Sequence, residues 1–303
     1  MWRNRTSRPS RLVLGLWVAL VVLGCGGSGQ AVARPESPGP LRVDFVAVAQ
    51  GDATLITSPT GKTVLIDGGP KGMADRLLAL VRERTAEPLD LVLLTHRHAD
   101  HLGGLATVIA AQGARLYMDA PFVHPSPAYA ALVRLLEAKK IPVREARRGR
   151  SIELGGGARL VLLTPPEPPI AGSHSDVNSN SVVARLEHGQ VRILLAADAE
   201  AETEAWLLQR SADLKAAALK LAHHGSRHSS TPRFLRAVSP ELVIISCGPG
   251  NAYDHPHPQT LARLARMGAR ILRTDEHGTI TLWSDGRQIS HQPPRADVAE
   301  KHP

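Results

Sequence analysis

The chain has 303 residues, of which 43% are hydrophobic and only 3% aromatic, so a sizeable core must be built from aliphatic side chains. The formal charge is +8, but residues 1–24 carry four arginines and no acid, and removing them leaves about +4. That mild charge excludes a strongly basic protein dedicated to nucleic-acid binding, and two cysteines exclude a disulfide framework.

Residues 1–24 have the pattern of an export signal. Their arginines precede an apolar run from Leu12 to Leu23, which is too short for a comfortable membrane span. The run leads into VLGC, which is typical of a bacterial lipobox with Cys25 as the lipidated residue, and Gly26 follows rather than aspartate. We expect an exported protein anchored by lipid at the cell envelope, on the outer membrane or its periplasmic side. An ordinary signal peptide cut after AVA at 31–33 is the alternative.

The rest of the chain divides into three parts. Residues 25–40 are rich in Gly, Ser and Pro and predict a flexible tether. Residues 41–288 are expected to form one domain, because the sequence shows no second linker there. Residues 289–303 are expected to be a polar, frayed tail. Cys247 lies in the apolar run LVIISCG, which predicts a buried, inert thiol.

Strand and helix signals alternate through the domain. Strand signals lie at 41–49, 53–58, 62–69, 89–95, 114–119, 151–165 (a hairpin), 181–198 (two strands around His188 and Gly189), 216–224, 241–246, 269–274 and 278–286. Helical spacing occurs at 72–84, 102–112, 126–140, 199–210, 231–239 and 258–268. Strands come in pairs early and between helices later. This favours an α/β fold with two sheets flanked by helices over a single parallel sheet.

The segment THRHADHLGG, residues 95–104, gathers metal-binding chemistry at the end of one buried strand. It supplies four candidate ligands: His96, His98, Asp100 and His101. A helix is expected to begin near Leu102, with Gly103 and Gly104 allowing it to pack closely. Imidazole and carboxylate groups suit Zn²⁺, Mn²⁺ or Fe. Four such groups in six residues exceed what one tetrahedral ion draws from one loop, so the spacing predicts two neighbouring ions.

This segment resembles the signature of the metallo-β-lactamase fold superfamily, and the whole domain is similar to the soluble metallo-hydrolase domain of the ComEC competence protein family. The matching pieces are AQGDATLI (49–56), VLIDGG (64–69), the histidine segment, NSNSVVARL (178–186), ILLAAD (193–198), LKLAHHGSRHSS (219–230), ISCGPGNAYDHPHP (245–258) and ILRTDEHGTITL (271–282). They cover essentially all of 41–288. The resemblance implies a four-layer αββα sandwich, with two mixed sheets flanked by helices.

The resemblance also implies roles for the metal-binding side chains. His96 and His98 would hold the first ion. Asp100 and His101 would hold the second, and Asp198 would bridge the two. Because Asp198 directly precedes a helical segment, a helix N-cap is the competing interpretation of this residue.

Two ligand positions stay open. Either His223 or His224 would complete the second site. For the first site, many superfamily members supply a further histidine where this chain, like its ComEC relatives, has an asparagine, Asn178 or Asn180. His174 is a possible substitute upstream. An amide oxygen is a weaker and harder ligand than imidazole, so we expect a weaker first site, or one that prefers Mn²⁺ to Zn²⁺.

Other residues near these motifs are candidates for supporting roles. Asp67 is expected to accept a hydrogen bond from a ligand histidine, or else to cap its own turn. Ser226, His228 and His255 are candidates for binding substrate, against the alternative that the first two belong to a polar loop leading to a helix cap. Arg273 is expected to pair with Asp275 for structural reasons.

The chain departs from the family pattern at several further positions. Ala197, Ala49 and Asp254 stand where glycine is usual, and Ala47 stands where relatives often carry aspartate. None of these departures replaces a candidate metal ligand, so we expect them to affect how the substrate fits and not how the metals bind.

The implied reaction is hydrolysis by a hydroxide that bridges two divalent ions, Zn²⁺ or Mn²⁺, with Asp100 and Asp198 as the residues acting most directly. A phosphodiester or nucleotide is the expected substrate, in a phosphodiesterase- or nuclease-like reaction. The alternatives are a β-lactam, lactone or other ester, and a non-catalytic binding lipoprotein. The mild charge and scarce aromatics weaken an assignment to DNA. The sequence leaves the oligomeric state open.

Overall fold

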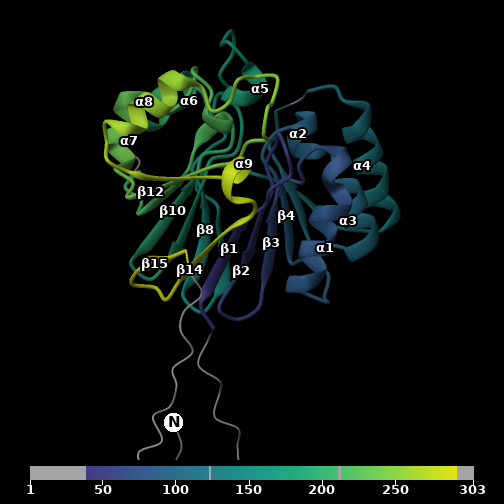
Figure 1. Ribbon diagram of the computed structural model, residues 1–303. Coiled ribbons are helices and arrows are strands. Elements are labelled where there is room, and N and C mark those ends of the chain that lie inside the picture. Colours follow the sequence, from purple (N-terminus) through teal and green to yellow (C-terminus); the bar gives the residue numbers. More distant parts are fainter. Residues whose placement is uncertain (1–38, 123, 211–212, 292–303) are drawn as a thin grey trace, which may run out of the picture. The chain divides into compact units, whose positions relative to one another are not determined.

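Two β-sheets packed face to face form the centre of the molecule, with helices covering both outer surfaces (Figure 1). The computed structural model describes residues 39–122, 124–210 and 213–291. The lipobox, most of the tether and most of the tail therefore lie outside the described residues. The expected α/β architecture of two mixed sheets flanked by helices is confirmed.

The first sheet has eight strands in the order β15-β14-β1-β2-β3-β4-β5-β6. Its strands are β1 (Leu41–Phe45), β2 (Thr54–Thr57), β3 (Thr63–Ile66), β4 (Leu91–Leu94), β5 (Tyr117–Asp119), β6 (Val143–Glu145), β14 (Ile280–Ser284) and β15 (Ile289–Ser290). β3 to β6 run parallel, whereas the pairs on the other side of β3 are antiparallel. β3 and β4 are buried along their whole length, which explains their unbroken aliphatic sequences.

The second sheet has seven strands in the order β13-β12-β11-β10-β9-β8-β7. They are β7 (Ser151–Gly155), β8 (Ala158–Leu162), β9 (Ala184–His188), β10 (Val191–Leu195), β11 (Ala218–Lys220), β12 (Leu242–Ile245) and β13 (Arg270–Arg273). β7 to β10 are antiparallel, and β10 to β13 are parallel. The carboxyl ends of the parallel strands in both sheets carry the loops that contain the candidate ligands.

The helices divide into two outer layers, visible to the right and left of the sheets in Figure 1. The right-hand layer contains α1 (Ala74–Arg84), α2 (Ala99–Leu102), α3 (Leu105–Gln112) and α4 (Pro127–Ala138). The other helices are α5 (Asp176–Ser179), α6 (Ala201–Gln209), α7 (Pro232–Val238), α8 (Pro258–Ala265) and α9 (Thr274–His277), with short 3₁₀ turns at Lys71–Met73 and Ala222–Gly225. Separate apolar clusters lie between the sheets and beneath each helical layer.

The structure differs from the sequence expectations at a few boundaries. Ile289 and Ser290, expected in the polar tail, pair with β14, so the folded part extends beyond residue 288. The helix expected at 102–112 is α3, which begins at Leu105, and a separate short helix, α2, precedes it because the chain turns directly after the extended His98. A segment without clear periodicity, Val143–Glu145, forms β6 through backbone pairing with β5.

Two glycines separate α2 from α3 and bring them against the loop after β3. A Cβ on Gly104 would lie 2.2 Å from the carbonyl oxygen of Gly68, and one on Gly103 would lie 2.5 Å from the backbone nitrogen of Lys71. The Gly68 amide donates to the His101 carbonyl at 2.6 Å, across the same contact. Glycine is therefore required for close backbone approach, and this contact fixes the histidine segment to the loop that carries Asp67.

We predict that Gly104→Ala lowers the free energy of unfolding by about 1–3 kcal/mol, because the added methyl meets backbone that cannot move aside. Gly72→Ala is the matched control, since a Cβ there has no heavy atom within 4 Å, and we expect a change below about 1 kcal/mol. Chemical denaturation of both variants measures the difference. Equal stability of the two variants would show that the close approach does not constrain the fold.

Candidate metal centre

The candidate ligands meet where loops from the two sheets converge. The loop after β4 and helix α2 come from the first sheet, while the loops after β10 and β11 come from the second. A cavity of about 350 Å³ opens at this seam. Its lining residues are Gln50, His98, Ala99, Asp100, Asn178, Asp198, His223, His224, Tyr253 and His255.

Two overlapping groups of side chains have ligand atoms close enough to share a metal ion. One group is His96, His98 and Asp198; the other is Asp52, His101, Asp198 and His224. In each group one ligand atom per residue lies within 4.8 Å of the others. The Asp198 carboxylate belongs to both, with Oδ2 3.7 Å from His96 Nε2 and Oδ1 3.3 Å from His101 Nε2.

Three of the four histidines in these groups, His96, His101 and His224, are oriented by hydrogen bonds on their Nδ1 atoms. His101 Nδ1 lies 2.8 Å from Asp67 Oδ2, and His224 Nδ1 lies 2.9 Å from the carbonyl oxygen of Ser246. His96 Nδ1 lies 3.0 Å from the Thr95 hydroxyl. For His101 and His224, an acceptor on Nδ1 fixes the tautomer that leaves the Nε2 lone pair free. His96 Nε2 lies 3.0 Å from His98 Nδ1, so these two rings contact each other within the first group. The Nε2 atoms of these three rings all face Asp198.

Asp67 contacts residues other than its own turn. Its Oδ1 accepts from the Thr95 amide at 2.8 Å, and its Oδ2 accepts from the Thr95 hydroxyl at 2.8 Å as well as facing His101. Asp67 is buried and has a left-handed backbone, with φ of 59°. The geometry therefore matches the expected acceptor for a ligand histidine better than a cap of the local turn.

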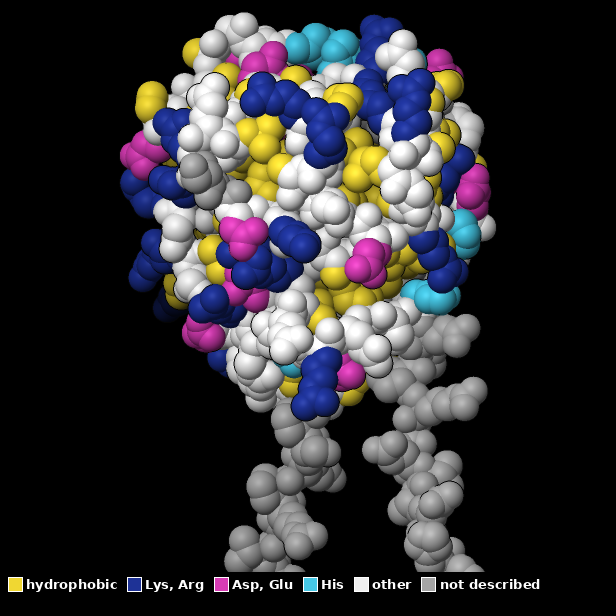
Figure 2. Space-filling model, turned by 90° about the vertical axis from the view of Figure 1, so that its left-hand side faces the viewer, with side chains coloured by type: hydrophobic (Ala, Val, Ile, Leu, Met, Phe, Trp, Pro, Cys, Tyr) yellow, Lys and Arg dark blue, Asp and Glu magenta, His cyan; other side chains and the backbone are white. Residues whose placement is uncertain are grey.

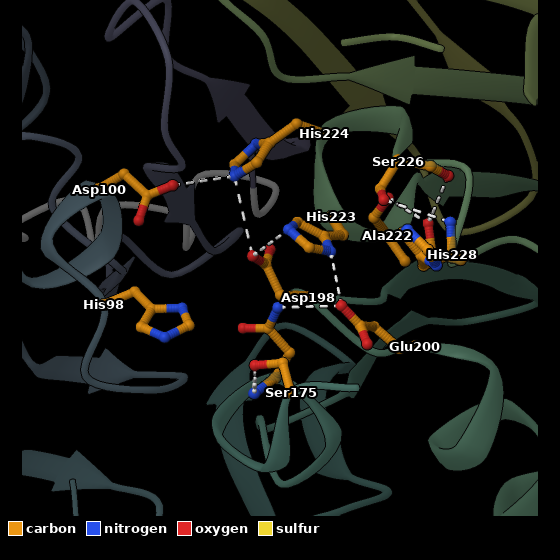
Figure 3. Close-up of polar contacts among 12 residues, drawn as sticks. His98, Asp100, Ser175, Asp198, Glu200, Ala222, His223, His224, Ser226 and His228 are labelled. Carbon is orange, nitrogen blue, oxygen red and sulfur yellow. Dashed lines mark hydrogen bonds and ion pairs between the residues drawn. The ribbon is translucent and has the colours of Figure 1, made fainter. Parts of the chain in front are cut away.

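The two adjacent histidines after β11 point to different places (Figure 3). His224 Nε2 lies 3.2 Å from Asp100 Oδ2 and 3.8 Å from Asp198 Oδ2. His223 Nδ1 lies 3.1 Å from Glu200 Oε1, while its Nε2 is 3.7 Å from Asp198 Oδ2. His224 therefore lies with the second group, and His223 forms part of the cavity wall.

Burial and neighbouring charges have opposite effects on the pKa values of the charged groups in this centre. Burial lowers the pKa of His96 well below its ordinary value, which favours the neutral form that binds metals. Burial also opposes ionisation of Asp198, but His101, His224 and His223 hold the pKa of Asp198 well below its usual range. In the same way, Asp198, Asp67 and Asp100 raise the pKa of His101 despite burial. The described residues thus surround Asp198 with groups that favour its anionic form.

Unsatisfied polar atoms show that the residues fit bound cations. Four buried atoms at this seam make no hydrogen bond among the described residues, although the first three lie 3.2–3.3 Å from a neighbouring titratable group: His101 Nε2, His224 Nε2, Asp198 Oδ1 and Asn178 Oδ1. Buried polar atoms in folded proteins almost always have partners. Histidine nitrogens and carboxylate oxygens with this arrangement form the donor set that divalent metals use.

The three candidates for completing the first group lie in different surroundings. Asn178 lines the cavity, and its Nδ2 donates to Glu200 Oε1 at 3.2 Å while Oδ1 has no partner. The structure does not bring Asn180 to the centre, because its side chain bonds to the backbone of Ile170 on one side and of Asp176 on the other. His174 is largely exposed and does not line this cavity.

Of the three candidate substrate-binding residues, one lines the cavity at the metal centre and the other two do not. His255 lines the cavity with its ring centroid 5.5 Å from that of His223, and burial lowers the pKa of His255 to about 4. Ser226 is buried beneath the loop, where its Oγ accepts from the His228 amide at 3.2 Å. His228 itself lines a different cavity.

The helix-cap interpretation of Asp198 does not match the structure. Helix α6 begins at Ala201, so Glu200 is the residue at the N-cap, and no side chain caps the helix. The expected pair of Arg273 and Asp275 is present at 2.5 Å, and Cys247 is buried.

Three positions where the resemblance leads one to expect glycine have left-handed backbone conformations. Ala49, Ala197 and Asp254 have φ values of 57°, 47° and 53°. Glycine adopts this conformation without steric cost, which explains why it is usual there. In this chain the fold holds the three larger residues in the same conformation, close to the site.

A buried ion pair beneath the centre was missed by the sequence reasoning. Lys220, at the end of β11, pairs with Asp52, and only 3% and 4% of these residues are exposed. Asp52 Oδ1 also faces His224 Nδ1 at 3.7 Å. A single charged residue in each of two apolar segments was an available signal, because a buried charge requires a partner.

Comparison with known families defines the class of the protein. Residues 46–248 match the model of the metallo-beta-lactamase superfamily, and the chain belongs to this superfamily of metal-dependent hydrolases.

Among curated proteins, the chain is 29% identical over 256 residues to ComE operon protein 3 of Bacillus subtilis (strain 168), covering 78% of this chain and 32% of that protein. It is 27% identical to competence protein ComA of Neisseria gonorrhoeae, covering 90% and 36%, and 30% identical to recombination protein 2 of Haemophilus influenzae, covering 80% and 28%. The chain thus spans about a third of the length of these relatives.

Solved structures share the fold at low sequence identity. The CmlA β-hydroxylase E377D mutant aligns with a TM-score of 0.54 and 16% identity, covering 82% of this chain and 54% of that one. Igni18, a metallo hydrolase from Ignicoccus hospitalis KIN4/I, aligns with a TM-score of 0.52 and 16% identity, covering 79% and 98%. Among the described residues of this chain, no helix has the length and hydropathy to cross a membrane.

The buried pair of Asp52 and Lys220 generates a stability prediction. Lys220→Met should lower the free energy of unfolding by about 3–5 kcal/mol, because it leaves a buried carboxylate without its cation. The double variant Asp52→Asn/Lys220→Met removes both charges and should recover most of that loss. Chemical denaturation in the presence of a chelator measures the free energy of unfolding without a contribution from bound metal. The single variant Asp52→Asn completes the cycle, and if the double variant loses as much stability as Lys220→Met and Asp52→Asn together, the two residues do not act as a pair.

Proposed function

We propose that this protein is a binuclear metal-dependent phosphodiesterase, which hydrolyses a phosphodiester or nucleotide at the seam between its two sheets. The observation that carries the proposal is the position of Asp198. Its carboxylate is shared by two groups of potential ligands and is buried with an unpartnered oxygen. A carboxylate in this position suits the bridge between two ions.

The proposed ligands follow from the two groups. The first ion would be held by His96, His98 and Asp198, and the Asn178 Oδ1, which has no hydrogen bond, would complete the site. The second would be held by His101, His224 and Asp198, with Asp100 beside His224. The first site offers an amide oxygen where the second offers imidazole and carboxylate, which supports weaker binding there and leaves Zn²⁺ and Mn²⁺ as the candidate metals.

The chain's own groups position the reaction. Divalent ions bound by these residues would lower the pKa of a bound water to about 7 and polarise the oxygen under attack. Asp67, Thr95 and the Ser246 carbonyl hold the ligand rings in the correct tautomer. His223 and His255 place imidazole edges on the cavity wall, where they can hydrogen-bond to the oxygens of the substrate.

The lining of the cavity supports an anionic substrate with an aromatic or sugar group. Histidines and bound cations suit phosphate oxygens. Tyr253 lies at the edge of the cavity with 67% of its surface exposed, so it offers one face for stacking a base. The relatives named as competence and recombination proteins support a nucleic-acid-related substrate.

A second candidate is a β-lactam, lactone or other ester hydrolase on the same metals. The asparagine at the first site and the similarity to competence proteins favour the phosphodiester. The two groups of clustered potential ligands, most of them buried, argue against a binding lipoprotein without catalysis.

We also propose that Cys25 carries the lipid anchor of an exported protein. The support is the lipobox sequence, which lies outside the described residues. Cys25→Ser should move the protein from the membrane fraction to the soluble fraction of the cell envelope. Unchanged partition of the variant would rule out lipidation at this residue.

The central test replaces Asp198. Asp198→Ala should lower both metal content and hydrolysis of bis(p-nitrophenyl) phosphate by at least about 10²-fold, in the range found when a metal shell is disrupted. Asp198→Ser is the matched variant, because serine keeps a small polar side chain but cannot bridge two ions with a carboxylate. Metal analysis of the folded protein measures the first effect, and turnover measures the second.

A folded Asp198→Ser variant that retains two metals and near-normal turnover would contradict the assignment. Wild-type protein that cleaves nitrocefin and not the phosphodiester would instead support the second candidate function.

A further inference from the structure

A second cavity lies beside the metal centre and contains none of the proposed metal ligands. Its volume is about 370 Å³, close to that of the first cavity. It is lined by His174, Glu200, Ala201, Glu202, Arg227, His228, Thr231, Pro232 and Arg263. The lining combines cationic, anionic and hydrogen-bonding groups, so it offers partners to a ligand that carries both an anion and hydrogen-bond donors.

Glu200 forms the wall between the two cavities. Its Oε1 lies 3.1 Å from His223 Nδ1 and accepts from Asn178 Nδ2 at 3.2 Å, and both of those residues line the first cavity. Its Oε2 lies 3.5 Å from Nδ1 of His174, a residue that lines the second cavity, and makes no hydrogen bond among the described residues. Because Glu200 is fully buried, this oxygen requires a donor.

Arg227 and His228 supply groups that can bind an anion, in contrast to the carboxylate of Glu200. The Arg227 side chain is exposed, and its Nε donates to His228 Nε2 at 3.0 Å. Within the described ranges, no partner is found for the two terminal nitrogens of Arg227, so they remain available for a phosphate. The His228 ring stacks on His174, with centroids 4.3 Å apart and an angle of 16° between the planes.

The loop that carries these residues is held from both sides. Arg263 donates to the carbonyl oxygens of Arg227, Ser229 and Ser230. From the other side, the buried Glu204 carboxylate accepts from the Ser230 and Thr231 amides. A binding group held in this way loses little conformational freedom when a ligand arrives.

The lining of this cavity includes two arginines, Arg227 and Arg263, beside the carboxylates of Glu200 and Glu202. Figure 2 shows the face on the left of Figure 1, where Lys and Arg predominate among the charged side chains and histidines gather at the upper rim. The first turn of α6 also opens on this cavity through Ala201 and Glu202, which adds the positive end of the helix dipole. The Glu202 carboxylate is at the exposed edge, so water screens its charge.

We propose that the second cavity binds the nucleotide unit next to the scissile phosphodiester, an inference that rests on the proposed function. The phosphate of that unit lies against Arg227 and His228, and a sugar hydroxyl donates to Glu200 Oε2. If the ligand were an isolated phosphate, Glu200 would lack a hydrogen-bond donor. If it were a neutral ester, Arg227 would lack an anion to bind. The mixed lining therefore selects a ligand with both groups, which a nucleotide has.

The test compares a long and a short substrate. The metal-loaded wild type and the Arg227→Gln variant are assayed with the dinucleotide pTpT and with bis(p-nitrophenyl) phosphate, which has no second nucleotide. We expect KM for pTpT to rise about tenfold or more in Arg227→Gln, because a charge-assisted contact is lost. KM for bis(p-nitrophenyl) phosphate should stay within about twofold. Arg236→Gln, an exposed arginine on α7 outside the cavity lining, is the matched control and should change neither value.

Calorimetric titration with thymidine 3′,5′-bisphosphate separates this inference from the proposed function, because it needs no turnover. Wild-type protein should bind this probe, and Arg227→Gln should bind it about tenfold more weakly. Binding that depends on Arg227 without hydrolysis of either substrate would support the cavity and overturn the phosphodiesterase. Equal binding by wild type and Arg227→Gln, or no binding by wild type, would overturn the cavity whatever the enzyme hydrolyses.

Discussion

The rest of the structure depends on one constraint, the burial of the Asp198 carboxylate among histidines at the seam between two sheets. A buried carboxylate is costly unless cations or donors surround it. Here His96, His101 and His224 present Nε2 atoms to the carboxylate, and one of its oxygens still lacks a hydrogen-bond partner among the described residues. Two divalent ions would satisfy the carboxylate and the rings together. The constraint thus links the architecture of the sheets to the chemistry of the site.

The fold accepts local strain to hold this arrangement. Asp67, Ala197, His223 and His224 all have positive φ values without being glycine, and each such residue costs about 1–3 kcal/mol. That cost persists only where surrounding structure fixes the backbone. Rigid parallel strands precede these turns, and the glycine contact between α2 and the loop after β3 locks the histidine segment in place. The strain lies at the residues that carry the proposed function and next to them.

Much of this molecule could be predicted from its sequence. Aliphatic runs such as LVLL and VRILL predicted buried strands, and the dense spacing of His96, His98, Asp100 and His101 predicted a metal centre, because both signals are local. The choice between His223 and His224 could not be predicted, since two left-handed residues in succession send neighbouring side chains in different directions. The pair of Asp52 and Lys220 was hidden because it joins residues 168 positions apart.

Anomalous diffraction from crystals of the metal-loaded protein tests the central claim most directly. The account predicts two anomalous peaks on either side of the Asp198 carboxylate, one beside His96 and His98 and the other beside His101 and His224. A single peak at saturating metal, or peaks that Asp198 does not join, would contradict it.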